Sequence, residues 1–281
     1  RAGMPVYPMW DPRRHVVELP EGLGKDRSRY FWCMGWDFGG RNPTVGLLAA
    51  VNTSGKILIC GEHYESMKTV RWHAARVREM VARVFEIPPE AQALREVETT
   101  EGKSELVPTF DIHQYVDLIV GDPTALAMIQ EYAMEGIAIG IGVREARIND
   151  LFAGIRRVAD YLTLGRLAVA KTCVNLIREF SLYVFEPERT GILRNSTERP
   201  VAKDDHALDA LRYLTMTRPS HEIDQLDAVR ERIKKVQDPF QRMIQEERAR
   251  ELGQLDSDDD HLFGVPSIDG ISEDTWLQWI A

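Results

Sequence analysis

The chain has 281 residues, of which 44% are hydrophobic and 28% charged, and its formal net charge is −9 at pH 7. This is the composition of an ordinary globular protein with enough apolar side chains for a sizeable core. No apolar run approaches the roughly 18 residues that a membrane span needs, and residues 1–10 contain no signal-peptide core, so the sequence argues against membrane insertion and against export.

The segment at the start of the chain, residues 1–29, is rich in proline, glycine and charged side chains. Such a segment is typical of a linker or arm rather than of a core element. The chain also begins at Arg1 without an initiator methionine, which indicates a piece of a longer polypeptide.

Strands and helices then follow one another along the chain. Three apolar runs with a glycine-containing turn between the second and third predict a three-stranded meander over 30–38, 44–52 and 57–66. The spacing of valines and alanines predicts a helix over 69–85, and the polar segment 88–114 is predicted to form a hairpin or flap. The remaining elements are alternating strands and helices, predicted at 117–121, 125–136, 137–143, 147–165, 167–170, 172–185 and 204–217.

This order predicts a mixed α/β sheet with helices on both faces, in a domain over residues 30–218. Residues 219–281 lose the periodicity and hold almost all of the acidic excess, so they are predicted to be an acidic tail, partly helical or disordered. Because the rest of the chain is close to neutral, any basic surface for nucleic acid must be local.

Two of the predicted strands end at an aspartate, Asp37 in "GWDFGG" and Asp122 in "VGDPT". Sites in open α/β sheets lie at the carboxyl ends of strands, and the glycines beside both aspartates allow a ligand to approach closely. The alternative is that each carboxylate caps a turn or the following helix.

The last predicted helix begins with "DDHALDALRY", in which Asp205 and Asp209 lie four residues apart and share a face. Asp209 has no cationic partner at Asp205 or Tyr213, so the repulsion between these carboxylates indicates a bound cation. Asp37, Asp122, Asp205 and Asp209 together are predicted to hold two Mg²⁺ or Mn²⁺ ions of the kind that promote phosphodiester cleavage. His206 is either a metal or proton-transfer group or a hydrogen-bonded structural residue.

The motifs "WDFGG", "VGDP" and "DDHALDALRY", with the early segment "YPMWDPRRHVVELP", resemble the nuclease domain of large terminase subunits of tailed phages. The resemblance implies a ribonuclease H-like fold and a metal-dependent endonuclease that cuts concatemeric viral DNA at the start and end of packaging. It implies that Asp37 and Asp122 are metal ligands on strands and that Asp209 is the ligand on the helix, with Asp205 and His206 as auxiliaries.

The resemblance also implies partners: double-stranded viral DNA, the small terminase subunit, and the portal protein, which the tail "DTWLQWI" would contact in the host cytoplasm at the procapsid. The early segment would join the domain to an ATPase domain of the same polypeptide. The chain itself has no GxxxxGK[ST] sequence, and "EGKS" at 101–104 is predicted to be the tip of a flap, so no nucleotide site is expected here.

The carboxylates repel phosphate, so DNA binding requires basic side chains around them. The candidates are Arg144, Arg147, Arg156, Arg157, Arg166, Lys171, Arg194, Arg199 and Lys203. The polar segments 95–110 and 188–203 are predicted to be flaps over the duplex.

Two alternatives to a nuclease remain open from the sequence. One is a DDE-type recombinase that transfers strands on the same fold, and the other is a non-catalytic docking module for portal or DNA, with structural carboxylates. If the chain is a nuclease, alanine at 37 or at 209 is predicted to abolish cleavage and to leave the melting temperature level or raised, because repulsion is relieved.

Overall fold

The computed structural model describes residues 3–25, 27–98, 104–122, 124–141, 151–186 and 199–217. All of these lie in the first of the two units into which the chain divides, Arg1–Arg218. The second unit, Pro219–Ala281, which includes the predicted acidic tail and its "DTWLQWI" end, lies outside the described residues. Within the described ranges, no helix combines the length and apolarity needed to cross a bilayer.

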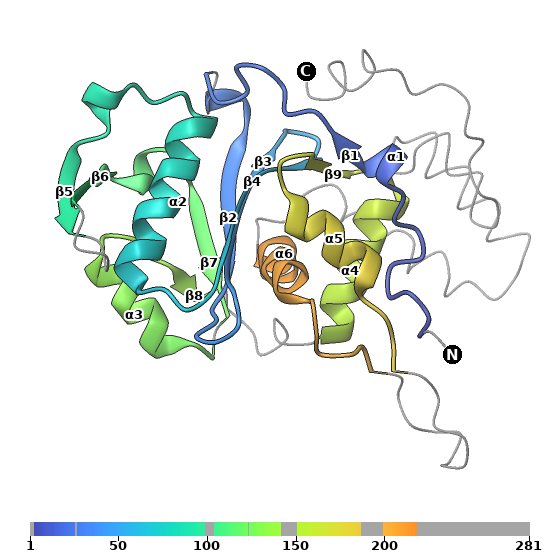
Figure 1. Cartoon of the computed structure of the whole chain (residues 1–281). Helices are drawn as coiled ribbons and strands as arrows, with labels where there is room; N and C mark the ends of the chain where they lie inside the picture. Colours follow the sequence, from blue (N-terminus) through green and yellow to red (C-terminus); the bar gives the residue numbers. More distant parts are fainter. Residues whose placement is uncertain are drawn as a thin grey trace, which may run out of the picture. The chain divides into compact units, whose positions relative to one another are not determined.

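The centre of the domain is a seven-stranded sheet in the order β1-β9-β4-β3-β2-β7-β8 (Figure 1). The pairings are parallel except on the two sides of β3, which runs antiparallel to both β2 and β4. The predicted meander β2-β3-β4 and mixed sheet are therefore confirmed. The strands are β1 Val16–Val17, β2 Phe31–Asp37, β3 Thr44–Val51, β4 Ile57–Glu65, β7 Leu118–Gly121, β8 Gly140–Ile141 and β9 Leu167–Ala170.

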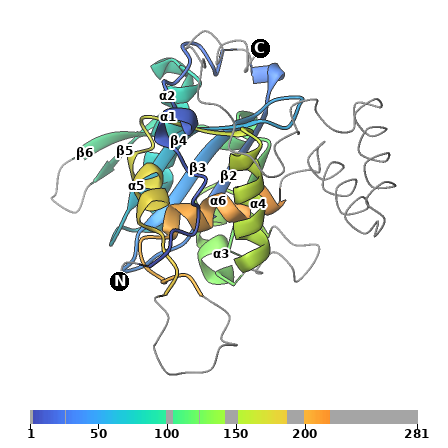
Figure 2. The same cartoon turned by 90° about the vertical axis from the view of Figure 1, so that its right-hand side faces the viewer.

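Helices cover both faces of this sheet, as the sequence predicts. Helices α2 and α3 lie on one face and α4, α5 and α6 on the other, and Figure 2 views the face that carries the latter three. The helices are α1 Pro12–His15, α2 Val70–Val84, α3 Leu126–Met134, α4 Leu151–Thr163, α5 Val174–Leu182 and α6 His206–Thr217, with short 3-10 turns at Arg27–Arg29, Pro89–Ala91 and Ile112–Gln114. Every residue of β3 is buried, as expected for a central strand covered on both faces.

The segment before β2 belongs to the core, contrary to the prediction of an arm. Strand β1 pairs in parallel with β9 and forms one edge of the sheet. Tyr7 packs edge-on against Phe180, and Trp10 stacks on the same ring at 4.1 Å between centroids. A few aromatic side chains are enough to dock this segment, although its average composition is that of a linker.

The predicted hairpin forms, and its described strands lie against α2. Its strands β5 Leu94–Glu98 and β6 Ser104–Pro108 make a separate two-stranded sheet. The guanidinium of Arg76 on α2 donates to both carboxylate oxygens of Glu105 at 2.6 Å, which holds the hairpin against α2. Because α2 and α6 cover opposite faces of the main sheet, the described strands of the hairpin lie on the face away from α6 (Figure 1). Residues 99–103 lie outside the described residues, and a flap over the duplex at 95–110 stays a prediction.

The position of α6 on the sheet depends on Gly35 in the middle of β2. A Cβ atom at Gly35 would lie 2.2 Å from the carbonyl oxygen of Ala210 and 2.8 Å from the Cβ of Leu214, so the helix backbone rests directly on the strand. At Gly39 and Gly121 the chain's own atoms also fill the space that the sequence assigned to a ligand, whereas a Cβ at Gly40 would meet nothing within 4 Å.

We expect Gly35→Ala to lower the free energy of unfolding by about 1–3 kcal/mol, because the extra methyl group forces α6 away from β2. Gly40→Ala is the matched control and changes the free energy of unfolding by less than about 0.5 kcal/mol. Urea unfolding of the two variants measures the difference. Equal stability of the two proteins would contradict direct packing of α6 on β2.

Candidate metal and nuclease site

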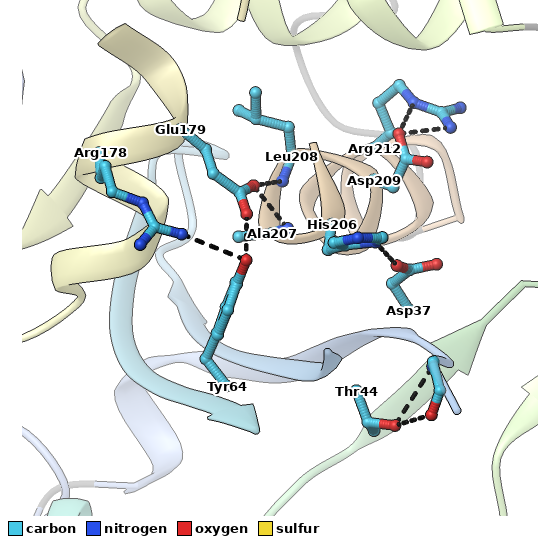
Figure 3. Close-up of polar contacts among 11 residues, drawn as sticks. Asp37, Thr44, Tyr64, Arg178, Glu179, His206, Ala207, Leu208, Asp209 and Arg212 are labelled. Carbon is cyan, nitrogen blue, oxygen red and sulfur yellow. Dashed lines mark hydrogen bonds and ion pairs between the residues drawn. The ribbon is translucent and has the colours of Figure 1, made fainter. Parts of the chain in front are cut away.

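The carboxylate of Asp37 faces α6 because side chains alternate along β2. Trp36 points to the other face, where its ring lies 4.5 Å from that of Tyr132 on α3, so Asp37 shares the face of Gly35. On that face, Nδ1 of His206 lies 3.0 Å from Oδ2 of Asp37 (Figure 3). Both side chains are largely buried, and the hydrogen bond to Asp37 raises the pKa of His206.

Asp205 lies beside this pair at the start of α6. The chain turns into the helix through Asp204, whose φ of 53° is in the left-handed region that aspartate tolerates better than most residues. The carbonyl of Asp205 then accepts the first helical hydrogen bond, from the amide of Asp209. Burial raises the pKa of the Asp205 carboxyl. The charge of the neighbouring His206 lowers this pKa, and the negative charge of Asp37 raises it. The two carboxylates are therefore close enough to repel each other.

Asp122 occupies the corresponding position on the neighbouring strand. Trp36 of β2 is in register with Gly121 of β7, so the next residues, Asp37 and Asp122, leave the sheet side by side. One carboxylate oxygen of Asp122 also accepts hydrogen bonds at 2.8 Å from the amide and the hydroxyl of Thr124. The strand-end role and the turn-capping role that the sequence left open are thus compatible.

Asp209 has a cationic partner that the sequence analysis missed. Its Oδ1 accepts hydrogen bonds from Nε and Nη2 of Arg212 at 3.0 and 2.8 Å, and the Arg212 side chain is only 5% exposed. The pKa of Asp209 is raised to about 6, mainly by burial; the charges of Asp37 and Asp205 add to this rise, and Arg212 opposes it. The inference that Asp209 needs a bound cation considered only the positions four residues away and overlooked Arg212 at i+3.

A buried carboxylic acid, Glu179 on α5, also reaches this region and was not predicted. Its side chain accepts hydrogen bonds from the amides of Ala207 and Leu208 in the first turn of α6 (Figure 3). Burial raises the pKa of Glu179 to about 7, although the three hydrogen bonds that it accepts, the third from Tyr64, act in the opposite direction. The signal in the sequence was a glutamate at a core position of an amphipathic helix.

The carboxylate oxygens near the carboxyl ends of β2 and β7 fit a hard divalent cation in type and charge. Asp37, Asp122, Asp205 and Asp209 offer carboxylate oxygens, the ligands that Mg²⁺ and Mn²⁺ prefer. Burial raises the pKa of Tyr213 on α6, and the charges of Asp122, Asp209 and Asp37 raise it further. Among the described residues, however, no three His, Cys, Asp or Glu side chains lie close enough together to hold a metal ion. The carboxylates are neighbours at one end of the strands and do not form a closed ligand set.

The family model described as Terminase RNaseH-like domain matches residues 34–218, well over half of the chain. The chain belongs to the terminase RNaseH-like domain family. The matched range begins within β2, just before Asp37, and ends just after α6, so it contains all the carboxylates of the site. The resemblance to terminase nuclease domains and the ribonuclease H-like fold predicted from it are confirmed.

The chain resembles solved structures of large terminases, and the first of those below shares its fold. A large terminase from a thermophilic bacteriophage, in complex with ATP-gamma-S, matches with a TM-score of 0.53 and 22% identity, over 77% of this chain and 46% of that one. The nuclease domain of the P22 large terminase matches with a TM-score of 0.48 and 16% identity, over 74% and 89%. The large terminase nuclease of thermophilic phage G20c with bound magnesium matches with a TM-score of 0.45 and 16% identity, over 76% of this chain and 98% of that one.

This terminase domain spans less than half the length of the large terminase that was solved with ATP-gamma-S. Among curated proteins, none matches the chain.

The predicted DNA-binding residues of the terminase domain are only partly described. Arg144, Arg147 and Arg194 lie outside the described residues. Of the others, Arg156, Arg199 and Lys203 are exposed, Arg157 is half-buried on α4, and Lys171 forms an ion pair with Glu18. Arg166 is buried just before β9, and the pairings of β9, β4, β3 and β2 place it at the opposite end of the strands from Asp37. A contact of Arg166 with DNA stays a prediction.

Proposed function

We propose that this chain is a metal-dependent endodeoxyribonuclease that hydrolyses phosphodiester bonds at the carboxyl ends of β2 and β7, where Asp37 and Asp122 lie. The observation that carries the proposal is that Asp37 and Asp122 leave adjacent parallel strands in register while Asp205 and His206 approach Asp37 from α6. Membership of the terminase RNaseH-like domain family supports a nuclease over a strand-transferring recombinase.

In this proposal Asp37, Asp122 and Asp205 would hold Mg²⁺ or Mn²⁺, two ions in all, with Asp209 as a further ligand. Water would complete the coordination of each ion, because these carboxylates do not form a closed ligand set. Such ions supply an activated water and stabilise the leaving oxygen of the phosphodiester. His206 fixes the orientation of the Asp37 carboxylate through its Nδ1, and Arg212 holds Asp209 from the opposite side. Asp205 is favoured over Asp209 as the principal ligand on α6, because Arg212 already neutralises Asp209.

The proposed substrate is concatemeric double-stranded viral DNA, cut at the initiation and at the termination of genome packaging in the host cytoplasm. The proposed partners are an ATPase domain of the same polypeptide, the small terminase subunit and the portal protein. The length relation supports the first of these, because the large terminase solved with ATP-gamma-S is more than twice as long as its region that matches this chain. Exposed Arg156, Arg199 and Lys203 would contact the phosphate backbone.

Incubation of supercoiled plasmid with the protein and Mn²⁺ tests this function. We expect nicked and then linear DNA, and we expect a chelator to stop the reaction because the water is activated only by the bound ions. Joining of added DNA ends to the plasmid would indicate a recombinase instead. Binding without any change in the plasmid would favour a docking module and would overturn the nuclease proposal.

A further inference from the structure

Among the described residues, Glu179 is the one carboxylic acid that is fully buried, with 0% of its surface exposed. A buried carboxylate is costly unless hydrogen bonds compensate for lost hydration. Here Oε2 accepts from the amides of Ala207 and Leu208 at 2.7 and 3.1 Å, and Oε1 accepts from the hydroxyl of Tyr64 at 2.8 Å. Glu179 therefore satisfies two of the amides that the start of α6 leaves without helical partners.

The strand β4 anchors this arrangement in the sheet. Glu62 and Tyr64 lie two apart on β4 and so project from the same face. The Glu62 carboxylate accepts from the amides of Asn175 and Leu176 at 3.0 and 2.7 Å and thereby fixes the start of α5. Tyr64 then holds Glu179 at the other end of α5. The sheet thus fixes α5, and α5 fixes the first turn of α6.

The two amides that donate to Glu179 belong to residues that lie between His206 and Asp209 in the chain. Ala207 follows His206 directly, and Leu208 precedes Asp209 directly. A shift of this turn would move His206 away from Asp37, from which it is 3.0 Å distant. The hydrogen bonds of Glu179 to α6 go to backbone amides, so it positions the side chains at the start of α6 through the helix backbone.

We propose that Glu179 is a positioning residue for the nuclease reaction, and that its hydrogen bonds to the first turn of α6 hold His206 and Asp205 against Asp37. This inference rests on the proposed nuclease function. Its physical basis is that small displacements of groups around a reacting centre lower the rate strongly, by about 100-fold for a displacement of about 1 Å.

Two conservative variants separate the position of Glu179 from its charge. In Glu179→Gln the amide oxygen can accept from both α6 amides, while the amide nitrogen donates to the hydroxyl oxygen of Tyr64, so the geometry is kept without the charge. In Glu179→Asp the charge is kept, but the side chain is one methylene shorter and its oxygens no longer reach the α6 amides. Glu186→Asp makes the same change at an exposed position just after α5 and is the matched control.

The test measures kcat and KM for Mn²⁺-dependent plasmid nicking, together with hydrogen exchange of the Ala207 and Leu208 amides. We expect Glu179→Asp to lower kcat by about tenfold to 100-fold with KM within about twofold, and to speed exchange of these two amides. Glu179→Gln should keep kcat within about threefold of the wild type, and Glu186→Asp should match it.

Other patterns of results would overturn the proposal. If Glu179→Gln loses as much activity as Glu179→Asp, or if Glu179→Asp keeps full activity, then Glu179 does not act by positioning. A wild-type protein that cuts no DNA defeats the proposed function itself, which is a separate result because it does not depend on any variant. The exchange measurement needs no cutting and reports on the first turn of α6 in either case.

Discussion

The Asp37→Asn protein is expected to cut plasmid DNA in Mn²⁺ at least about 10³-fold more slowly than the wild type. The substitution removes the negative charge at the point where β2, β7 and α6 meet, and preorganised charge of this kind is among the largest contributions to catalysis. Stability should change by only about 1 kcal/mol, because the side chain keeps its shape and its amide can still form a hydrogen bond with His206, without the charge. Nicking rates and urea unfolding measure the two effects.

Asp117→Asn provides the matched control. Asp117 immediately precedes β7, at the opposite end of this strand from Asp122, and it accepts hydrogen bonds at 2.8 Å from the amide of Trp32 and from Arg27. Its replacement is expected to lower stability and to leave the rate of cleavage of the folded protein unchanged. Cleavage by Asp37→Asn at the wild-type rate would remove Asp37 from the site and with it the proposed centre of the reaction.

Asp209→Ala is expected to lower the free energy of unfolding by about 3–5 kcal/mol, which reverses the prediction made from the sequence alone. The substitution leaves Arg212 with a buried charge and no carboxylate, and breaking a buried pair by removing one partner is strongly destabilising. Nη1 of Arg212 already lacks a hydrogen-bond partner among the described residues, so the guanidinium has little other compensation. Urea unfolding of the single variant gives the size of the loss.

Two further proteins control this measurement. The double variant Asp209→Ala, Arg212→Met should recover most of the stability, because it removes the unpaired charge as well. Glu79→Ala removes the carboxylate from an Arg–Glu pair with the same i, i+3 spacing on α2, where Arg76 keeps Glu105 and is 26% exposed, so its cost should stay below about 1 kcal/mol. A loss at Asp209 no larger than that at Glu79 would mean that the ion pair is not a structural one.

The positions of the strands and helices were largely predictable, because periodicity reports which side chains are buried. The strand predicted over 30–38 is β2 Phe31–Asp37, and the helix predicted over 69–85 is α2 Val70–Val84. The segment before β2 was misjudged because it shows no periodicity and has the composition of a linker. Its docking depends instead on the individual contacts of Tyr7 and Trp10.

The site was predictable in part. Aspartates at the ends of strands are visible in the sequence, and the parallel register of β2 and β7 places Asp37 and Asp122 together. The ion pair of Asp209 was missed because the sequence analysis considered only positions four residues away, whereas Arg212 lies three residues away. Glu179 was missed because its core position in a helix indicates burial but does not show which element its carboxylate contacts.

The sequence by itself determined the α/β class, the order of the elements and the family resemblance, since all three depend on short-range patterns of apolar and acidic residues. Only the tertiary structure decided which face of β2 meets α6, which cation each aspartate contacts, and how a buried carboxylate on α5 fixes the start of α6. The reason is physical: hydrophobic periodicity specifies that a face is buried, whereas hydrogen bonds and ion pairs between distant residues depend on distances of a few tenths of an ångström that packing sets.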